Sequence, residues 1–153
     1  MRGMWVRIKF TNREETQFHL KICIAIESHL IKKGLLPKRE WYLILDQEDR
    51  IVGLPRYEIT RAEKLRREKY RCPDILWWDN GLWILEIDGY VHHVKSANTE
   101  KRNDIYKNNN CHFFIIETFE IINGKVKNKS IESIIKELDS KIWILWYNKY
   151  ENK

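Results

Sequence analysis

The sequence predicts a mixed α/β (α+β) fold, built as a three-layer sandwich in which a mixed central β-sheet lies between helices. Two short segments, 75–78 and 82–87, are apolar on both faces over most of their length, and a sheet buried on both sides needs helices above and below it. Amphipathic patterns toward both ends of the chain supply such helices. A helix at 99–109 then leads to a buried strand at 113–118, and this crossover should be right-handed.

The composition is that of one globular domain spanning residues 1–153. Hydrophobic residues make up 43% of the chain, with seven Trp and seven Tyr, which excludes a disordered tail. The net charge of +6 favours a polyanionic partner, although many basic proteins bind none. Three scattered cysteines give no disulfide framework, so we expect a reducing, cytoplasmic setting (the host cytoplasm if the chain is viral). We expect no membrane association, because there is no signal peptide and no apolar run of spanning length.

A long N-terminal helix is predicted after residues 5–10, which are expected to be a short strand or an entry segment. Thr11-Asn12-Arg13-Glu14 has the pattern of a capping box, and the helix should run to about residue 33, before Gly34. Glu15 projects inside the apolar stripe, with His19 beside it. Glu15 is therefore either a metal-site acid or a residue at the solvated end of the stripe. The stripe comprises Phe18, Ile22, Ala25, Ile26 and Leu30.

The next segment combines an irregular sheet edge with a short basic helix. Residues 41–45 should form a strand, 46–50 a polar turn and 51–54 an edge segment. Thr60-Arg61-Ala62-Glu63 is a second capping box, opening a helix to about Tyr70. Its charge suits phosphate neutralisation, with a solvated face balanced by glutamates as the equal alternative. The candidate DNA contacts on this helix are Arg61, Lys64 and Arg67.

The strands at 75–78 and 82–87 form the hairpin that carries the candidate site. A three-residue loop, 79–81, with Gly81 in the left-handed conformation pairs Trp78 with Leu82 and sets Asp74 opposite Glu86. Opposed side chains have β-carbons about 4.5–5.5 Å apart, so both carboxylates could reach one cation. Asp88 shares the face of Glu86, because side chains alternate along a strand. Two of these acids interrupt an apolar run, which favours a metal or acid–base site over solvated strand ends.

The C-terminal third should form one more helix. Asn123-Gly124 indicates a turn, and the last helix should start at Ser130 and pack against the sheet. Aromatic residues near its end are expected to pack in the core rather than to stack on nucleobases; they are Trp143, Trp146 and Tyr147. The residues expected to be buried are Ile131, Ile134, Ile135, Leu138, Ile142 and Leu145.

Several of these residues carry a family resemblance. Pro73-Asp74, followed after twelve positions by Glu86-Ile87-Asp88, resembles the PD-(D/E)xK nuclease superfamily. The continuation, with Gly89 and His92 and then Arg102, Tyr106 and Asn110 at steps of four, is similar to its branch of very-short-patch-repair-like endonucleases. The pattern is also similar to small nucleases of crenarchaeal filamentous viruses. The resemblance covers residues 73–118, and it departs from the family where Asp88 replaces the usual lysine and Asn110 a glycine.

The resemblance implies a restriction-endonuclease-like αβββαβ core and a Mg²⁺-dependent nuclease that acts on double-stranded DNA, with Mn²⁺ as a substitute. Asp74 and Glu86 would be metal ligands, and Asp88 would share the ion or hold a second. His92 would orient or deprotonate the attacking water in place of the lysine. The residues expected to contact phosphates near the cut are Lys95, Lys101 and Arg102.

Two other hypotheses compete with an active nuclease. One is a catalytically inactive DNA-binding protein on the same fold. The other is a zinc site formed by His92, His93, Cys111 and His112, whose spacing matches no usual pattern. The oligomeric state stays open and includes a homodimer.

Overall fold

The central element is a three-stranded mixed sheet, formed by β3 (Ile75–Trp78), β4 (Leu82–Asp88) and β5 (His112–Glu117) in the order β3-β4-β5. The computed structural model describes residues 2–65, 69–90 and 96–151. β3 and β4 are antiparallel, whereas β4 and β5 are parallel and joined through α4 (Ser96–Lys107). The expected mixed sheet and the parallel placement of its last strand are thus confirmed.

The hairpin between β3 and β4 has the predicted three-residue loop. Trp78 pairs with Leu82 and Leu76 with Ile84, which is the register that puts Asp74 level with Glu86. Two loop residues have positive φ, Asn80 at 51° and Gly81 at 123°. Asparagine and glycine tolerate this region better than other residues, so the loop sequence explains the register.

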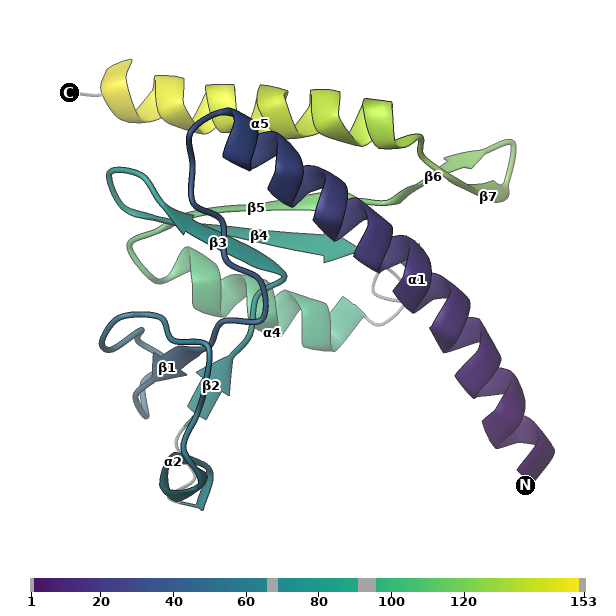
Figure 1. Cartoon of the computed structure of the whole chain (residues 1–153), viewed down its shortest axis with the longest axis horizontal. Helices are drawn as coiled ribbons and strands as arrows, with labels where there is room; N and C mark the ends of the chain where they lie inside the picture. Colours follow the sequence, from purple (N-terminus) through teal and green to yellow (C-terminus); the bar gives the residue numbers. More distant parts are fainter. Residues whose placement is uncertain (1, 66–68, 91–95, 152–153) are drawn as a thin grey trace.

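Helices cover both faces of the sheet (Figure 1). α1 (Arg2–Lys32) and α5 (Ile131–Glu151) lie on one face, where Ile26 and Leu138 join a core that includes Trp77 and Trp83. α4 lies on the other face, where Tyr106 packs with a second group of buried side chains, among them Leu43, Leu76, Leu82 and Ile84. The alternation of these residues along β3 and β4 is what makes a two-sided sheet and three layers.

Smaller elements flank the sheet (Figure 1). β1 (Leu43–Leu45) pairs antiparallel with β2 (Lys69–Arg71), and α2 (Arg61–Leu65) lies between them in sequence. β6 (Phe119–Ile122) and β7 (Lys125–Asn128) form a hairpin whose turn contains Asn123 and Gly124, both with positive φ. Among the residues that the structure describes, no helix combines the length and apolar character needed to cross a membrane.

Two predicted segments have different structures. Residues 5–10 belong to α1, because no glycine or proline after Gly3 interrupts the helix, and the capping box at 11–14 therefore lies inside it. The second capping box is confirmed, since the Glu63 amide donates to Thr60 Oγ1 at 3.1 Å, but α2 ends at Leu65. The segment Lys69–Arg71 is a strand instead, and it satisfies the backbone groups of β1.

The last helix starts where predicted but buries fewer residues. Ser130 Oγ accepts from the Ser133 amide at 3.1 Å, and Ile134 and Leu138 are fully buried. Ile131 was expected to be buried but is 41% exposed. The aromatic residues that were expected in the core are exposed as well; they are Trp143, Trp146 and Tyr147. With a period of 3.6 residues, a face set by positions 134, 138, 142 and 145 turns positions 143 and 147 away from the sheet.

Candidate functional site

The candidate site lies at the end of β4 that is farthest from the hairpin loop. Glu86 and Asp88 are 6% and 5% exposed, unusually buried for carboxylates. Asp74 precedes β3 and turns back toward β4, where its Oδ2 accepts a hydrogen bond of 2.7 Å from the backbone amide of Ile87. The carboxyl groups of Asp74 and Glu86 lie close enough for each to shift the pKa of the other. The hairpin register therefore brings together two acids that are twelve residues apart along the chain.

α4 supplies partners for the acids of β4 from one face of the sheet. Tyr106 donates its hydroxyl to Glu86 Oε1 at 3.0 Å. Arg102, one helical turn earlier, donates from Nη1 and Nη2 to the two oxygens of Asp88, at 2.9 and 2.8 Å. Its Nη1 also lies 3.6 Å from Glu86 Oε2. The step of four between Arg102 and Tyr106 thus aims both side chains at neighbouring carboxylates on one strand.

α1 supplies a partner for Asp74 from the opposite layer. His19 Nε2 lies 3.2 Å from Asp74 Oδ1, and its Nδ1 lies 3.6 Å from the Sγ of Cys23, one turn further along the helix. The sequence pattern places His19 beside the apolar stripe, but it does not predict a role for this residue in the site. A polar residue one turn from a buried cysteine, on the inner side of an amphipathic helix, was the available signal.

The surroundings shift the pKa values of Asp74 and Glu86 in opposite directions. Burial, together with the negative charge of Asp74, raises the pKa of Glu86 well above its ordinary value. Burial also acts to raise the pKa of Asp74, but the hydrogen bond and charge of His19 outweigh it and lower that pKa. The same hydrogen bond raises the pKa of His19 to about 10. In the absence of a further cation, protonation is therefore favoured on Glu86 over Asp74.

Asp74 and Glu86 are the residues that suit a metal ion. Their oxygen atoms are hard ligands, and the negative charge of Asp74, which raises the pKa of Glu86, would equally favour a cation bound between the two groups. Among the described residues, no group of three or more His, Cys, Asp or Glu side chains is arranged to hold a metal. Mg²⁺ usually keeps several water ligands and uses one or two carboxylates, so a two-carboxylate set fits this ion in chemical type.

The structure describes some of the other candidate residues, whereas the rest lie outside the described residues. Lys101 and Arg61 are exposed, on α4 and α2. Arg102 is engaged by Asp88 and by Asn103, to which its Nε and Nη2 donate. Two of the four residues of the zinc alternative are described: Cys111 precedes β5 and His112 begins it. The other two, His92 and His93, lie outside the described residues. So do the remaining candidates or their side chains, namely Glu15, Lys64, Arg67, His92 and Lys95.

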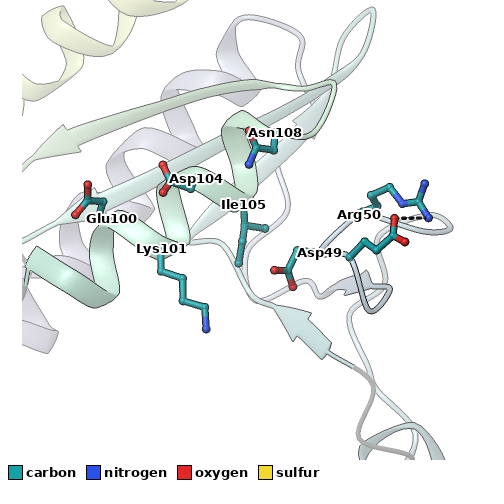
Figure 2. Close-up of a pocket in the computed structure, with 8 residues that line it drawn as sticks. Asp49, Arg50, Glu100, Lys101, Asp104, Ile105 and Asn108 are labelled. Atoms are coloured by element: carbon teal, nitrogen blue, oxygen red, sulfur yellow. Dashed lines mark ion pairs between the residues drawn. The ribbon is translucent and has the colours of Figure 1, made fainter.

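A pocket of about 450 Å³ lies beside α4 but apart from the carboxyl pair (Figure 2). Lys101 extends into it, facing the loop that carries Asp49 and Arg50. This pocket is lined by four carboxylates and two basic side chains. The excess of negative charge disfavours a phosphate group there. Another pocket, of about 510 Å³, reaches Asp88 from between α4 and β5 and contains Lys107 and Lys141.

Comparison with known proteins gives no family for the chain. No family model, no curated protein and no solved structure matches it.

Proposed function

We propose that this chain is a metal-dependent deoxyribonuclease that hydrolyses phosphodiester bonds in double-stranded DNA. The observation that carries the proposal is the close approach of Asp74 and Glu86 at the buried C-terminal end of β4. Two acids forced together in this way are costly unless a proton or a cation lies between them. Such an arrangement is commonly kept at a functional site, where the unfavourable contact is part of the chemistry.

The proposed cofactor is Mg²⁺, with Mn²⁺ as a substitute, held by Asp74 and Glu86. When bound, the ion would act as a Lewis acid on a phosphate oxygen. The charges of the described residues around the pair support a cation: three carboxylates lie near the guanidinium of Arg102 and the imidazole of His19. With all three carboxylates ionised, this group of side chains keeps a net negative charge even when His19 is protonated, and a divalent ion would take the place of a proton on Glu86.

The chain's own residues would fix the geometry of that pair. Tyr106 orients Glu86 by donating a hydrogen bond to its Oε1, and its other oxygen, Oε2, makes no hydrogen bond to Tyr106. The Ile87 amide holds Asp74 Oδ2, so the main chain of β4 sets the direction of the second carboxylate. Since both carboxylates are held by groups of a rigid strand and helix, little reorganisation is needed at the site. His92 keeps its proposed role with the attacking water.

The order of elements supports a restriction-endonuclease-like core as part of the same proposal. In the central sheet, α1 precedes the β3–β4 hairpin, and α4 and β5 follow it. This order becomes αβββαβ when one further strand of the same sheet pairs with the free edge of β3. A single bridge between Lys38 and Leu76 lies where that first strand would pair. The net charge of +6 and the exposed Arg61 support a DNA partner.

An inactive DNA-binding protein on the same fold is the second candidate. The observation that favours it is the ion pair of Asp88 and Arg102, because Asp88 stands where the resemblance expects a lysine and is neutralised inside the protein. In that case, the fold would retain its basic surface while the acid pair served no reaction. The two candidates differ in whether the chain cuts the DNA that it binds.

Cleavage of linear and circular duplex DNA, with Mg²⁺, Mn²⁺ or EDTA, separates these candidates. We expect the wild-type chain to cut with either ion and not with EDTA. Glu86→Gln should bind DNA but not cut it, and the exposed Glu120→Gln serves as the matched control that retains cleavage. Wild-type protein that binds duplex DNA and leaves it intact with both ions would refute the nuclease and support the second candidate.

A further inference from the structure

We propose that Asp88 and Arg102 form a fixed internal ion pair, in which Asp88 positions Arg102 beside Glu86 and is not itself a metal ligand. This inference rests on the proposed metal site at Asp74 and Glu86. It reduces the acids available to the ion from three to two, and it assigns Arg102 to the support of the site rather than to DNA.

The donors of Arg102 are almost fully committed. Nε and Nη2 both donate to Asn103 Oδ1, at 3.2 and 3.0 Å, and Nη2 also donates to Asp88 Oδ2 at 2.8 Å. Nη1 donates to Asp88 Oδ1 at 2.9 Å. A guanidinium has five N–H groups, so one on Nη1 remains, on the atom that lies 3.6 Å from Glu86 Oε2. With a side chain only 12% exposed, Arg102 is not placed to bind a DNA phosphate.

Asp88 differs from the other two acids in what its oxygens contact. Both of its oxygens accept from Arg102, in the two-pronged geometry that is the strongest arrangement of this ion pair. Asp74 and Glu86 instead accept from a main-chain amide and a tyrosine hydroxyl, and they contact each other. A metal ion that recruited Asp88 would leave a buried guanidinium without its counter-ion. Glu86 has no such two-pronged ion pair, and the partner of Asp74, His19, is less buried than Arg102 and contacts only one oxygen of Asp74.

The pair has a consequence for Glu86. The guanidinium of Arg102 lies 3.6 Å from Glu86 Oε2, close enough to become its direct ion-pair partner if the hydrogen bonds that Arg102 makes to Asp88 were lost. Asp88 holds that charge in place, and it also prevents Arg102 from pairing fully with Glu86 and competing with the ion. Removing Asp88 alone should therefore weaken metal binding indirectly, and removing both charges should restore it.

The test is Mn²⁺ binding to the full chain by titration calorimetry, which does not depend on catalysis. Loss of a residue that supports a metal site commonly costs about 10-fold in affinity, and we expect this of Asp88→Asn. The double variant Asp88→Asn/Arg102→Gln should return to within about 5-fold of wild type, since neither residue is a ligand. Asp74→Asn should abolish binding, and Asp104→Asn, an exposed acid on α4, is the control without effect.

The outcomes are separable. A double variant that binds Mn²⁺ more than about 5-fold more weakly than wild type, while its circular dichroism spectrum stays native, would overturn the inference and make Asp88 a ligand. Melting temperatures add an independent readout: Asp88→Asn and Arg102→Gln should each lower the melting temperature, and the double variant should melt no lower than either. If the wild-type chain binds no Mn²⁺, the proposed function itself fails and the inference falls with it.

Discussion

Replacing Glu86 with glutamine should stabilise the protein when no metal is present, and increasingly so as the pH rises. The pKa of Glu86 is raised by burial and by Asp74, so the folded state holds a proton that the unfolded state releases above its ordinary pKa of 4.5. A group whose pKa is raised on folding contributes its full stabilisation of the folded state below its pKa in the unfolded chain. That contribution is lost as the pH rises toward its pKa in the folded protein. Glutamine keeps the hydrogen bonds and needs no proton.

The size of this effect follows from linkage. Each pH unit above the unfolded pKa costs up to about 1.4 kcal/mol for as long as Glu86 stays protonated in the folded protein. Between pH 5 and pH 7 this amounts to about 3 kcal/mol at most. Arg102, 3.6 Å from Glu86, opposes the shift, so we expect a gain of about 1–3 kcal/mol for Glu86→Gln at pH 7 relative to pH 5. In a chain of this size, that corresponds to about 2–10 °C in melting temperature.

The assay is thermal unfolding of wild type, Glu86→Gln and the control Glu120→Gln at pH 5, 6 and 7, all in EDTA. The difference between Glu86→Gln and wild type should grow with pH, while the control follows wild type at each pH. Adding Mn²⁺ should narrow the difference, because the ion stabilises only the wild-type pair. A difference that stays constant or shrinks as the pH rises would refute the assignment of the extra proton to Glu86.

Three further outcomes are expected. Tyr106→Phe leaves a buried carboxylate oxygen of Glu86 without its donor, and it should cost about 1–3 kcal/mol in urea unfolding. The pKa of His19 is raised to about 10, so its stabilising ion pair is complete below pH 6.5 and lost as the pH rises through 10. The cost of His19→Gln, about 1 kcal/mol for a partly exposed pair, should therefore vanish over that range in pH-dependent melts. Leu138→Ala should cost about 2–5 kcal/mol by the same urea measurement, whereas the exposed Ile131→Ala should change stability by about 0.5 kcal/mol or less.

The parts of the fold that were predicted correctly are those with local causes. The loop Asp79–Gly81 determines the register of β3 and β4 through residues that accept positive φ, and Ser130 caps α5 through its own side chain. The failures involve distant partners. Lys69–Arg71 looked helical because its basic residues continue the pattern of α2, yet it pairs with β1, more than twenty residues earlier. No local pattern reports such a pairing.

The candidate site divides in the same way. The meeting of Asp74 and Glu86 follows from the hairpin register and was available from the sequence. The roles of His19, Tyr106 and Arg102 were not, because they depend on how α1 and α4 dock on opposite faces of the sheet. The hydrophobic pattern shows which face of a helix is buried, but not which polar group will meet which strand residue.

The layers also explain why stability and the proposed activity oppose each other in this chain. The end of β4 is held between α1 and α4, so every acid there is desolvated and needs a partner from one helix or the other. Asp88 has a complete partner in Arg102, and Asp74 has one in His19. Among the residues that the structure describes, the partners of Glu86 from the helices are the Tyr106 hydroxyl and the Arg102 charge at 3.6 Å. The least compensated carboxylate is thus the one in contact with Asp74, and a cation that bound there would stabilise the fold by relieving the same repulsion that recruits it.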